Sequence, residues 1–246
     1  MLKIGSVQLG NVPRVILCVD GNLSAVAQAA GEGVDILEIR VDLFRNLAPA
    51  SVVTEVRALR RHRLPLIGTV RSELEGGAAS ITEIQRIELY TKVAPLVDAI
   101  DVDLAAKTLT EIIKVVHSNK KVLILSHHDF NGTPAEATLT HIVKKAGTLG
   151  ADIVKIATMA QNEQDLVRLL QFTLHHRSKN LVTIAMGSKG SFSRLTFPLA
   201  GSLMTYTSMS PTDGQIPAKR LIEDLRFYYP AYNEELINRL GLLEYA

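Results

Sequence analysis

The stretch KVLILSHHDFNGTPAEATLTHIVKKAGTLGADIVKIAT, residues 121–158, decides the fold. An apolar run at residues 121–129 is followed by helical spacing at residues 136–149 and by a second apolar run at residues 151–158. Two such runs joined through a helix form a βαβ unit, whose strands lie parallel in one sheet. The stretch therefore predicts an α/β protein with a parallel sheet.

Strand-like and helix-like runs alternate in the same way over the rest of the chain. The strand candidates number eight, at residues 14–20, 35–42, 65–71, 98–104, 121–129, 151–158, 181–187 and 201–207. Helical spacing covers residues 23–31, 52–61, 84–93, 109–116, 136–149 and 164–175. Because no composition break or low-complexity linker divides these repeats, they predict a single closed (β/α)8 TIM barrel over residues 1–246 rather than two domains.

Three further segments bear on this prediction. The alternative, a doubly wound open sheet, normally has a GxGxxG turn after its first strand, and CVDGNLSAV at residues 18–26 lacks that spacing. Residues 3–9 precede the first repeat and predict a hairpin-like segment that caps one end of the barrel. Residues 226–243 follow the last repeat as a further element.

The composition is that of a globular protein with a large core, because 47% of the 246 residues are hydrophobic and 21% are charged. A net charge of +2 with scattered lysines and arginines argues against a nucleic-acid or membrane partner. Cys18 is the only cysteine, which excludes an internal disulfide and fits a reducing compartment. Since no secretory signal or membrane-spanning run is visible, we expect a cytoplasmic protein.

Charged and polar residues alternate with apolar residues on several strand candidates. The apolar set must face the helices, so the other set faces the lumen of the barrel. The residues turned inward are Glu38, Arg40, Asp42, Asp101, Asp103, Ser126, His128 and Lys155. Burying an unpaired charge costs several kcal/mol, so the inward charges must pair with one another or meet a polar ligand. The structural alternative is an internal salt-bridge lattice of Glu38, Arg40, Asp42, Asp101 and Asp103. Their position near the C-terminal ends of the strands favours an active site.

Lys155 and His128 are the candidate reactive residues. Three arginines are expected near the lysine: Arg40, Arg71 and Arg194. Their charges should lower the pKa of Lys155 and leave a neutral amine that can form an imine with a ketone. His128 suits general acid/base catalysis near neutral pH. The structural alternatives are a lysine that reaches solvent and an ordinary core histidine.

Loops after the strands supply further candidates. In TVRSELEGG, residues 69–77, Glu75 could orient the histidine, although a solvated glutamate is the alternative. The run GSKGSFSRL, residues 187–195, contains Arg194, whose guanidinium could grip a carboxylate through two hydrogen bonds. A metal site is not expected, because His127 and His128 point to opposite faces of their strand and no HExxH motif is present.

Five motifs, in order along nearly the whole chain, closely resemble those of type I 3-dehydroquinate dehydratases, the Schiff-base enzymes of the shikimate pathway. They are EIRVD, TVRSELEGG, HHDF, VKIAT and MGSKGSFSR. The resemblance implies an imine on Lys155, acid/base catalysis by His128 and a supporting role for Glu75. The substrate-binding residues that it implies are Glu38, Arg40, Arg71, Arg194, Ser210 and Gln215.

The sequence departs from the family pattern at two places. Family members often have S-A-P-G-Q after the eighth strand, where this chain has SPTDGQ, so Gln215 aligns and Ser210 aligns only if the loop is one residue longer. Cys18 stands where the first strand often has a serine. Neither departure changes the three catalytic candidates.

The resemblance also implies the reaction, a syn elimination of water from 3-dehydroquinate that yields 3-dehydroshikimate. It implies a lyase of aromatic amino acid biosynthesis that needs no metal or organic cofactor and assembles as a homodimer. Two alternatives remain open. One is a class I aldolase-type barrel that cleaves carbon–carbon bonds through an imine, and the other is a non-catalytic barrel that binds a small carboxylate.

Overall fold

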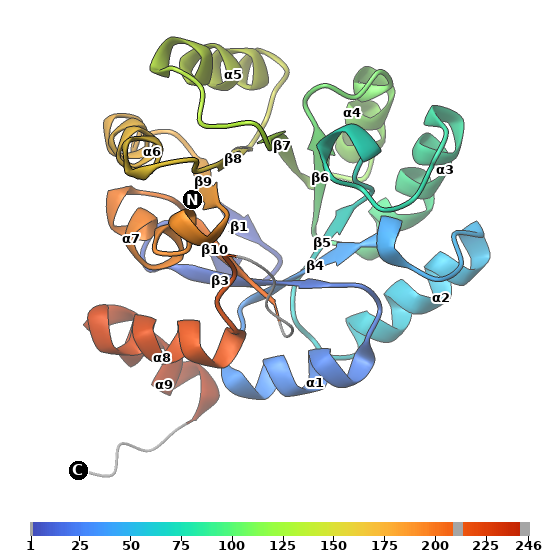
Figure 1. Ribbon diagram of the computed structural model, residues 1–246. Coiled ribbons are helices and arrows are strands. Elements are labelled where there is room, and N and C mark those ends of the chain that lie inside the picture. The colour runs from blue at the N-terminus through green and yellow to red at the C-terminus, as the bar shows by residue number, and fades with distance from the viewer. Residues whose placement is uncertain (1, 209–213, 242–246) are drawn as a thin grey trace.

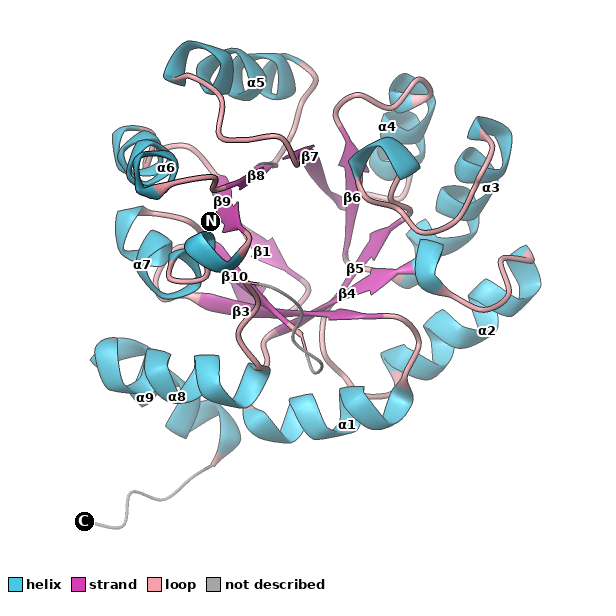
Figure 2. Cartoon of the chain, viewed as in Figure 1, coloured by secondary structure: helices cyan, strands magenta, loops and turns pink. Residues whose placement is uncertain are grey.

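The computed structural model describes residues 2–208 and 214–241 as one parallel sheet curled into a barrel and surrounded by helices (Figure 1, Figure 2). The sheet order is β10 (Met204–Thr207), β3 (Arg14–Val19), β4 (Ile36–Arg40), β5 (Leu66–Thr69), β6 (Ala99–Asp103), β7 (Val122–Asp129), β8 (Ile153–Met159) and β9 (Leu181–Met186). The backbone N–H of Leu203 donates to the carbonyl of Leu181 over 2.8 Å and links β9 to β10. The predicted TIM barrel is confirmed.

The helices form the outer layer. They are α1 (Leu23–Glu32), α2 (Pro49–Arg60), α3 (Glu83–Val93), α4 (Leu109–Ser118), α5 (Glu136–Thr148), α6 (Glu163–His175), α7 (Ser193–Ala200), α8 (Ala218–Tyr228) and α9 (Pro230–Leu240). Their apolar faces pack on the outward residues of the strands, such as Leu37, Val154 and Ile156, in the larger of two hydrophobic clusters. The six predicted helices correspond to α1 to α6, with shifts of up to three residues at their ends.

The lumen has an apolar layer beneath a polar one. On most strands a buried apolar residue precedes a polar lumen residue by two positions, as in Ile36 before Glu38 and Ile153 before Lys155. Alternate residues of a strand share a face, so the polar layer lies nearer the C-terminal ends. The antiparallel hairpin of β1 (Lys3–Ile4) and β2 (Val7–Gln8) adds the fully buried Ile4 to the apolar layer. This confirms the predicted cap.

Two local features differ from the predictions. The polar run at residues 187–195 was assigned no helix, whereas the structure has a 3-10 turn at Ser188–Gly190 and then α7, whose eight residues are too few for clear periodicity. The strand predicted at residues 35–42 ends at Arg40, because Asp42 lies in a 3-10 turn. There the Asp42 carboxylate accepts the backbone N–H groups of Arg71 and Ala78, at 3.2 Å each.

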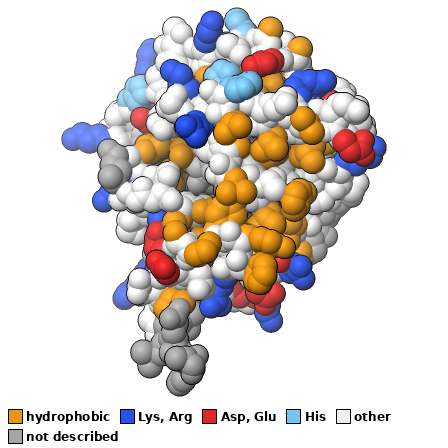
Figure 3. Space-filling view, turned by 90° about the vertical axis from the view of Figure 1, so that its left-hand side faces the viewer, with side chains coloured by type: hydrophobic (Ala, Val, Ile, Leu, Met, Phe, Trp, Pro, Cys, Tyr) orange, Lys and Arg blue, Asp and Glu red, His pale blue; other side chains and the backbone are white. Residues whose placement is uncertain are grey.

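Exposed hydrophobic side chains gather on the side of the molecule formed by α6, α7 and α8 (Figure 3). The large exposed residues on these helices are Val167, Leu174, Leu199, Phe227 and Tyr228. Within the described parts of the chain, no helix combines the length and apolar character that crossing a bilayer would require.

Candidate active site

Lys155 lies at the centre of the polar layer. Its neighbours Val154 and Ile156 pack outward, so β8 directs its side chain into the lumen, where it is 3% exposed. Its Nζ donates to Oε2 of Glu38 at 2.8 Å and to Oδ2 of Asp101 at 3.0 Å. The predicted facing of the lysine is therefore confirmed, and its charge is held between carboxylates from β4 and β6.

Arg71, which follows β5, joins the remaining acids into one network. Its Nη2 donates to Oδ1 of Asp101 at 2.9 Å and lies 3.7 Å from Oε1 of Glu38. Its Nη1 donates to the hydroxyl of Ser126 at 2.6 Å and to the carboxylate of Asp103. All five residues are buried. The internal lattice that the sequence left open exists in part. Arg71 and Lys155 join Glu38, Asp101 and Asp103, whereas the expected members Arg40 and Asp42 pair with each other.

The prediction that Lys155 has a lowered pKa was wrong. Burial and the charge of Arg71 act to lower it, but the carboxylates of Asp101 and Glu38 outweigh them and raise the pKa of Lys155 above its ordinary value. The carboxylates win because both lie within hydrogen-bonding distance of Nζ, whereas the expected cations are not in direct contact with it. In the free protein the lysine is an ammonium.

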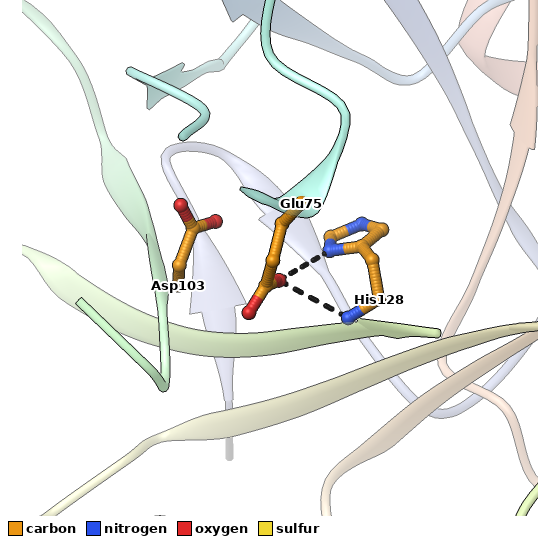
Figure 4. Close-up of side chains that lie close together, drawn as sticks. All are labelled: Glu75, Asp103 and His128. Carbon is orange, nitrogen blue, oxygen red and sulfur yellow. Dashed lines mark hydrogen bonds and ion pairs between the residues drawn. The ribbon is translucent and has the colours of Figure 1, made fainter. Parts of the chain in front are cut away.

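Glu75 and His128 form a hydrogen-bonded pair at the mouth of the lumen (Figure 4). Oε2 of Glu75 lies 2.8 Å from Nδ1 of His128 and accepts the backbone N–H of the same residue at 3.1 Å. Burial, followed by the charges of Arg71 and Lys155, holds the pKa of His128 well below 6.5. Burial and the charge of Asp103 raise the pKa of Glu75 to about 8. Near neutral pH the carboxyl group of Glu75 is therefore protonated and the imidazole of His128 is uncharged.

Glu75, Asp103 and His128 are also the described residues whose donor atoms could hold a metal ion, since these atoms lie within 4.8 Å of one another (Figure 4). Their existing bonds argue for a different use. Asp103 already binds the guanidinium of Arg71 and accepts the backbone N–H of Ser72 at 2.8 Å, while His128 and Glu75 bind each other. A cation added here would face the charge of Arg71, so the group fits proton transfer better than metal binding.

Arg40 lies at the rim rather than in the lattice. Its Nε and Nη2 donate to the two oxygens of Asp42 at 2.9 and 2.7 Å, and Nη2 also donates to the carbonyl of Gly76 at 3.2 Å. This bidentate pair ties the end of β4 to the loop that carries Glu75. Arg40 therefore lies near the C-terminal end of its strand, as predicted. It binds Asp42 and Gly76, whereas Glu38 binds Lys155.

Arg194 is a buried cation on α7 whose partners, within the described part of the chain, are neutral oxygens. Its Nη1 donates to the carbonyl of Ala185, to the carbonyl of Gly190 at 3.4 Å and to the hydroxyl of Ser193 at 3.0 Å. Its Nε is buried without a hydrogen-bond partner. Burial lowers the pKa of Arg194 to about 10. Such a guanidinium lacks the anion that would normally accompany it.

The loop after β10 carries the last two predicted residues. Gln215 is exposed, and its Oε1 accepts a hydrogen bond from the hydroxyl of Ser208 at 2.7 Å. Ser210 lies outside the described residues.

Tyr206 of β10 was not singled out from the sequence. Its ring centroid lies 4.3 Å from Nζ of Lys155, and its side chain is buried in the lumen cluster. The run MTYT would have indicated that Met204 and Tyr206 share the inward face, since they are two residues apart. An aromatic residue in an apolar strand is usually interpreted as core, which is why the contact was missed.

The fold and the site together define a (β/α)8 barrel with a buried amine and an acid/base pair at the C-terminal ends of its strands, where barrel enzymes carry their active sites. The particular family follows from comparison with known proteins. A model of the type I 3-dehydroquinase family matches residues 12–231, and the chain belongs to that family.

Individual relatives agree with this assignment. The chain is 36% identical over 230 residues to 3-dehydroquinate dehydratase of Methanococcoides burtonii, covering 92% of this chain and 97% of the relative. It is 33% identical over 217 residues to that of Thermodesulfovibrio yellowstonii, covering 87% and 95%. Among solved structures it is similar to type I 3-dehydroquinate dehydratase of Clostridium difficile with covalently modified comenic acid, with a TM-score of 0.86, 30% identity and coverage of 94% and 98%.

Proposed function

We propose that this chain is a hydro-lyase that converts 3-dehydroquinate to 3-dehydroshikimate through an imine on Lys155. The observation that carries the proposal is the placement of Lys155 between two carboxylates, near enough to the Glu75–His128 pair for its charge to lower the pKa of His128. Membership of the type I 3-dehydroquinase family supplies the substrate. The reaction belongs to aromatic amino acid biosynthesis by the shikimate pathway.

Imine formation needs the neutral amine, so the Lys155 ammonium must first lose a proton. Glu38 and Asp101 are the carboxylates in contact with it and are the immediate acceptors. The amine then adds to the C3 ketone, and loss of water gives an iminium. An iminium carries the same single positive charge as the ammonium, so the carboxylates that bind the resting lysine also stabilise the intermediate.

The elimination follows at the neighbouring carbons. The iminium accepts the electrons of the C2–H bond while His128, uncharged in the resting site, removes that proton through Nε2. Glu75 binds Nδ1 and fixes the orientation of the ring. The resulting enamine expels the C1 hydroxyl, which takes the proton back from His128 and leaves as water. Hydrolysis of the imine releases 3-dehydroshikimate and regenerates the amine.

The substrate carboxylate is assigned to Arg194. A buried guanidinium with neutral partners gains most from a planar anion, because two charge-assisted hydrogen bonds would replace solvation lost on burial. Glu38, Arg40, Arg71, Ser210 and Gln215 are proposed as the other substrate-binding residues. Arg40 and Arg71 are already paired with acids, so they would both position the neighbouring carboxylates and contact the ligand.

We also propose that residues 1–246 act as one catalytic domain in the cytoplasm and assemble as a homodimer, as the family resemblance implies. Light scattering tests the assembly, since a dimer has twice the 26.9 kDa mass of one chain. The mass of the Leu199→Asp variant, which places a charge on the exposed apolar side of α7, is compared with that of the wild type. A wild-type mass of one chain at micromolar concentration would contradict the homodimer.

Borohydride reduction with each candidate ligand tests the reaction. A stable adduct on Lys155 with 3-dehydroquinate or 3-dehydroshikimate, located by peptide mass analysis, is expected. Lys155→Arg is the matched control, because it keeps a cation opposite Glu38 and Asp101 but cannot form the adduct. An adduct only with a phosphorylated ketone would indicate an aldolase. Absence of any adduct would indicate the non-catalytic carboxylate-binding barrel.

A further inference from the structure

Tyr206 forms the third side of the site that holds the Lys155 nitrogen. The centroid of its ring lies 4.3 Å from Nζ, within the range of a cation–π contact. The other two sides are the carboxylates of Glu38 and Asp101. Tyr206 is 7% exposed and comes from β10, whereas the lysine comes from β8, with β9 between them in the sheet. The contact therefore spans part of the lumen.

The ring differs from the two carboxylates in what it requires of the nitrogen. An ammonium has three N–H donors and can bond both Glu38 and Asp101. The iminium formed with a ketone keeps the positive charge but has only one N–H, so it cannot keep both hydrogen bonds. Attraction to the face of an aromatic ring needs charge and not a donor. The contact with Tyr206 can therefore persist when the imine forms.

The hydroxyl of Tyr206 does not account for its presence in the site. It is buried beside the carboxylate of Glu38, which interacts with it at a geometry poorer than that of a normal hydrogen bond. Burial, with the charges of Glu38 and Asp101 adding to it, holds the pKa of Tyr206 well above its usual range, so the phenol stays neutral beside the lysine. Removing the hydroxyl should therefore cost only this weak contact with Glu38 and leave the ring face unchanged.

We propose that Tyr206 is a positioning residue whose ring face holds the Lys155 nitrogen while it changes from ammonium to iminium. This inference rests on the proposed imine chemistry and extends it to a residue outside the five sequence motifs. It also predicts which atoms matter most, since the ring should contribute more than the hydroxyl.

Three variants distinguish the contribution of the Tyr206 ring from those of its hydroxyl and of the space that the side chain fills. Tyr206→Phe keeps the ring, Tyr206→Met fills part of the same space without one, and Tyr206→Leu serves if the methionine variant does not fold. Met204→Leu is the matched control, because Met204 lies on the same face of β10 and belongs to the same lumen cluster. The measurements are the rate of borohydride trapping with saturating 3-dehydroquinate as a function of pH, together with kcat and KM.

Loss of the ring should slow adduct formation and kcat by about two- to thirty-fold while KM changes little. The pH dependence of trapping should also move to lower pH, because the ring stabilises the charged lysine and its removal makes the neutral amine easier to form. Tyr206→Phe should stay closer to the wild type than Tyr206→Met, and Met204→Leu should match the wild type. A merely structural role would not move the pH dependence.

The outcomes are distinct. A Tyr206→Met or Tyr206→Leu variant that keeps the wild-type trapping rate and pH dependence overturns the inference, while adduct formation by the wild type leaves the proposed function intact. A Tyr206→Phe variant as impaired as Tyr206→Met also overturns it, because the hydroxyl would then be the active group. If the wild type forms no adduct, the proposed function itself fails and the inference fails with it.

Discussion

At the scale of single residues, the charges of the lumen balance one another. Glu38, Asp101 and Asp103 face the cations of Lys155 and Arg71, and Arg86 lies 3.7 Å from Asp103. Removing one member of such a buried set leaves its partner uncompensated, at a cost of about 3–5 kcal/mol. Variants that retain charge therefore test mechanism more cleanly than alanine does.

The first prediction concerns His128. His128→Ala should lower kcat by about a hundred- to ten-thousand-fold, because the elimination loses its acid/base group, while the imine on Lys155 still forms. Turnover and borohydride trapping measured on one preparation separate the two steps. A variant that neither turns over nor traps would place His128 in imine formation instead.

The second prediction concerns pH. The pKa of His128 is held well below 6.5 by burial and by the charges of Arg71 and Lys155, and the iminium carries the same charge as the lysine. A base with a lowered pKa stays deprotonated until the pH falls through that lower value. The acid limb of kcat should therefore lie below pH 6.5, measured between about pH 5 and about pH 8. A midpoint at or above 6.5 would contradict the assignment of His128 as the base.

The third prediction concerns Arg194. Arg194→Met should raise KM about ten- to a hundred-fold, because the substrate carboxylate loses charge-assisted hydrogen bonds. The variant should also unfold at the same temperature or higher, since burial disfavours the charge, as its lowered pKa of about 10 reflects. Thermal unfolding and steady-state kinetics test both parts. A less stable variant with unchanged KM would make Arg194 a structural residue.

At the scale of elements, Gly190 lets the turn before α7 pack closely against β9. A β-carbon at Gly190 would lie 2.2 Å from the carbonyl oxygen of Ala185, to which Arg194 also donates. Gly190→Ala, the fourth prediction, should therefore push the turn away from β9, lower stability and raise KM by displacing Arg194. Gly31→Ala is the control, since nothing lies within 4 Å of the new β-carbon in α1, and it should stabilise by about 0.5–1 kcal/mol. Urea unfolding and KM distinguish the two variants.

The regular elements were predictable because their periodicity is local. The eight strands of the barrel sheet lie within the segments predicted for them, apart from one residue at Met159, since alternation fixes both the strand and the facing of residues such as Lys155. The same alternation overextended β4 to Asp42, because it cannot detect a turn stabilised by distant backbone N–H groups.

The inward facing of the proposed site residues was predictable, but their electrostatics were not. Alternation and the family motifs selected Glu38, His128 and Lys155, yet the sign of the lysine pKa shift depended on distances between different strands. Sequence spacing carries no information on which of several inward charges touch. For the same reason the contact between Tyr206 and Lys155 required coordinates.

At the scale of the whole molecule, the two ends of the barrel are separate. The hairpin packs into the apolar layer at the N-terminal end, and the polar layer at the other end carries the proposed catalytic residues. Ile4→Ala, the fifth prediction, should lower the free energy of unfolding by about 2–4 kcal/mol through the cavity that it leaves. It should leave kcat unchanged. A marked fall in kcat at a temperature where the variant is fully folded would show that the two ends are coupled.

The join between β9 and β10 has a consequence for reactivity. The sheet is a band whose two edges meet where Leu203 donates to Leu181, and Tyr206 lies on one edge strand while Lys155 lies one strand in from the other. Parting the edges would draw the aromatic face away from the amine. If Tyr206 positions Lys155 as proposed, the junction between β9 and β10 must stay closed for the amine to be held correctly. Opening of this junction should then first slow the attack of Lys155 on the ketone.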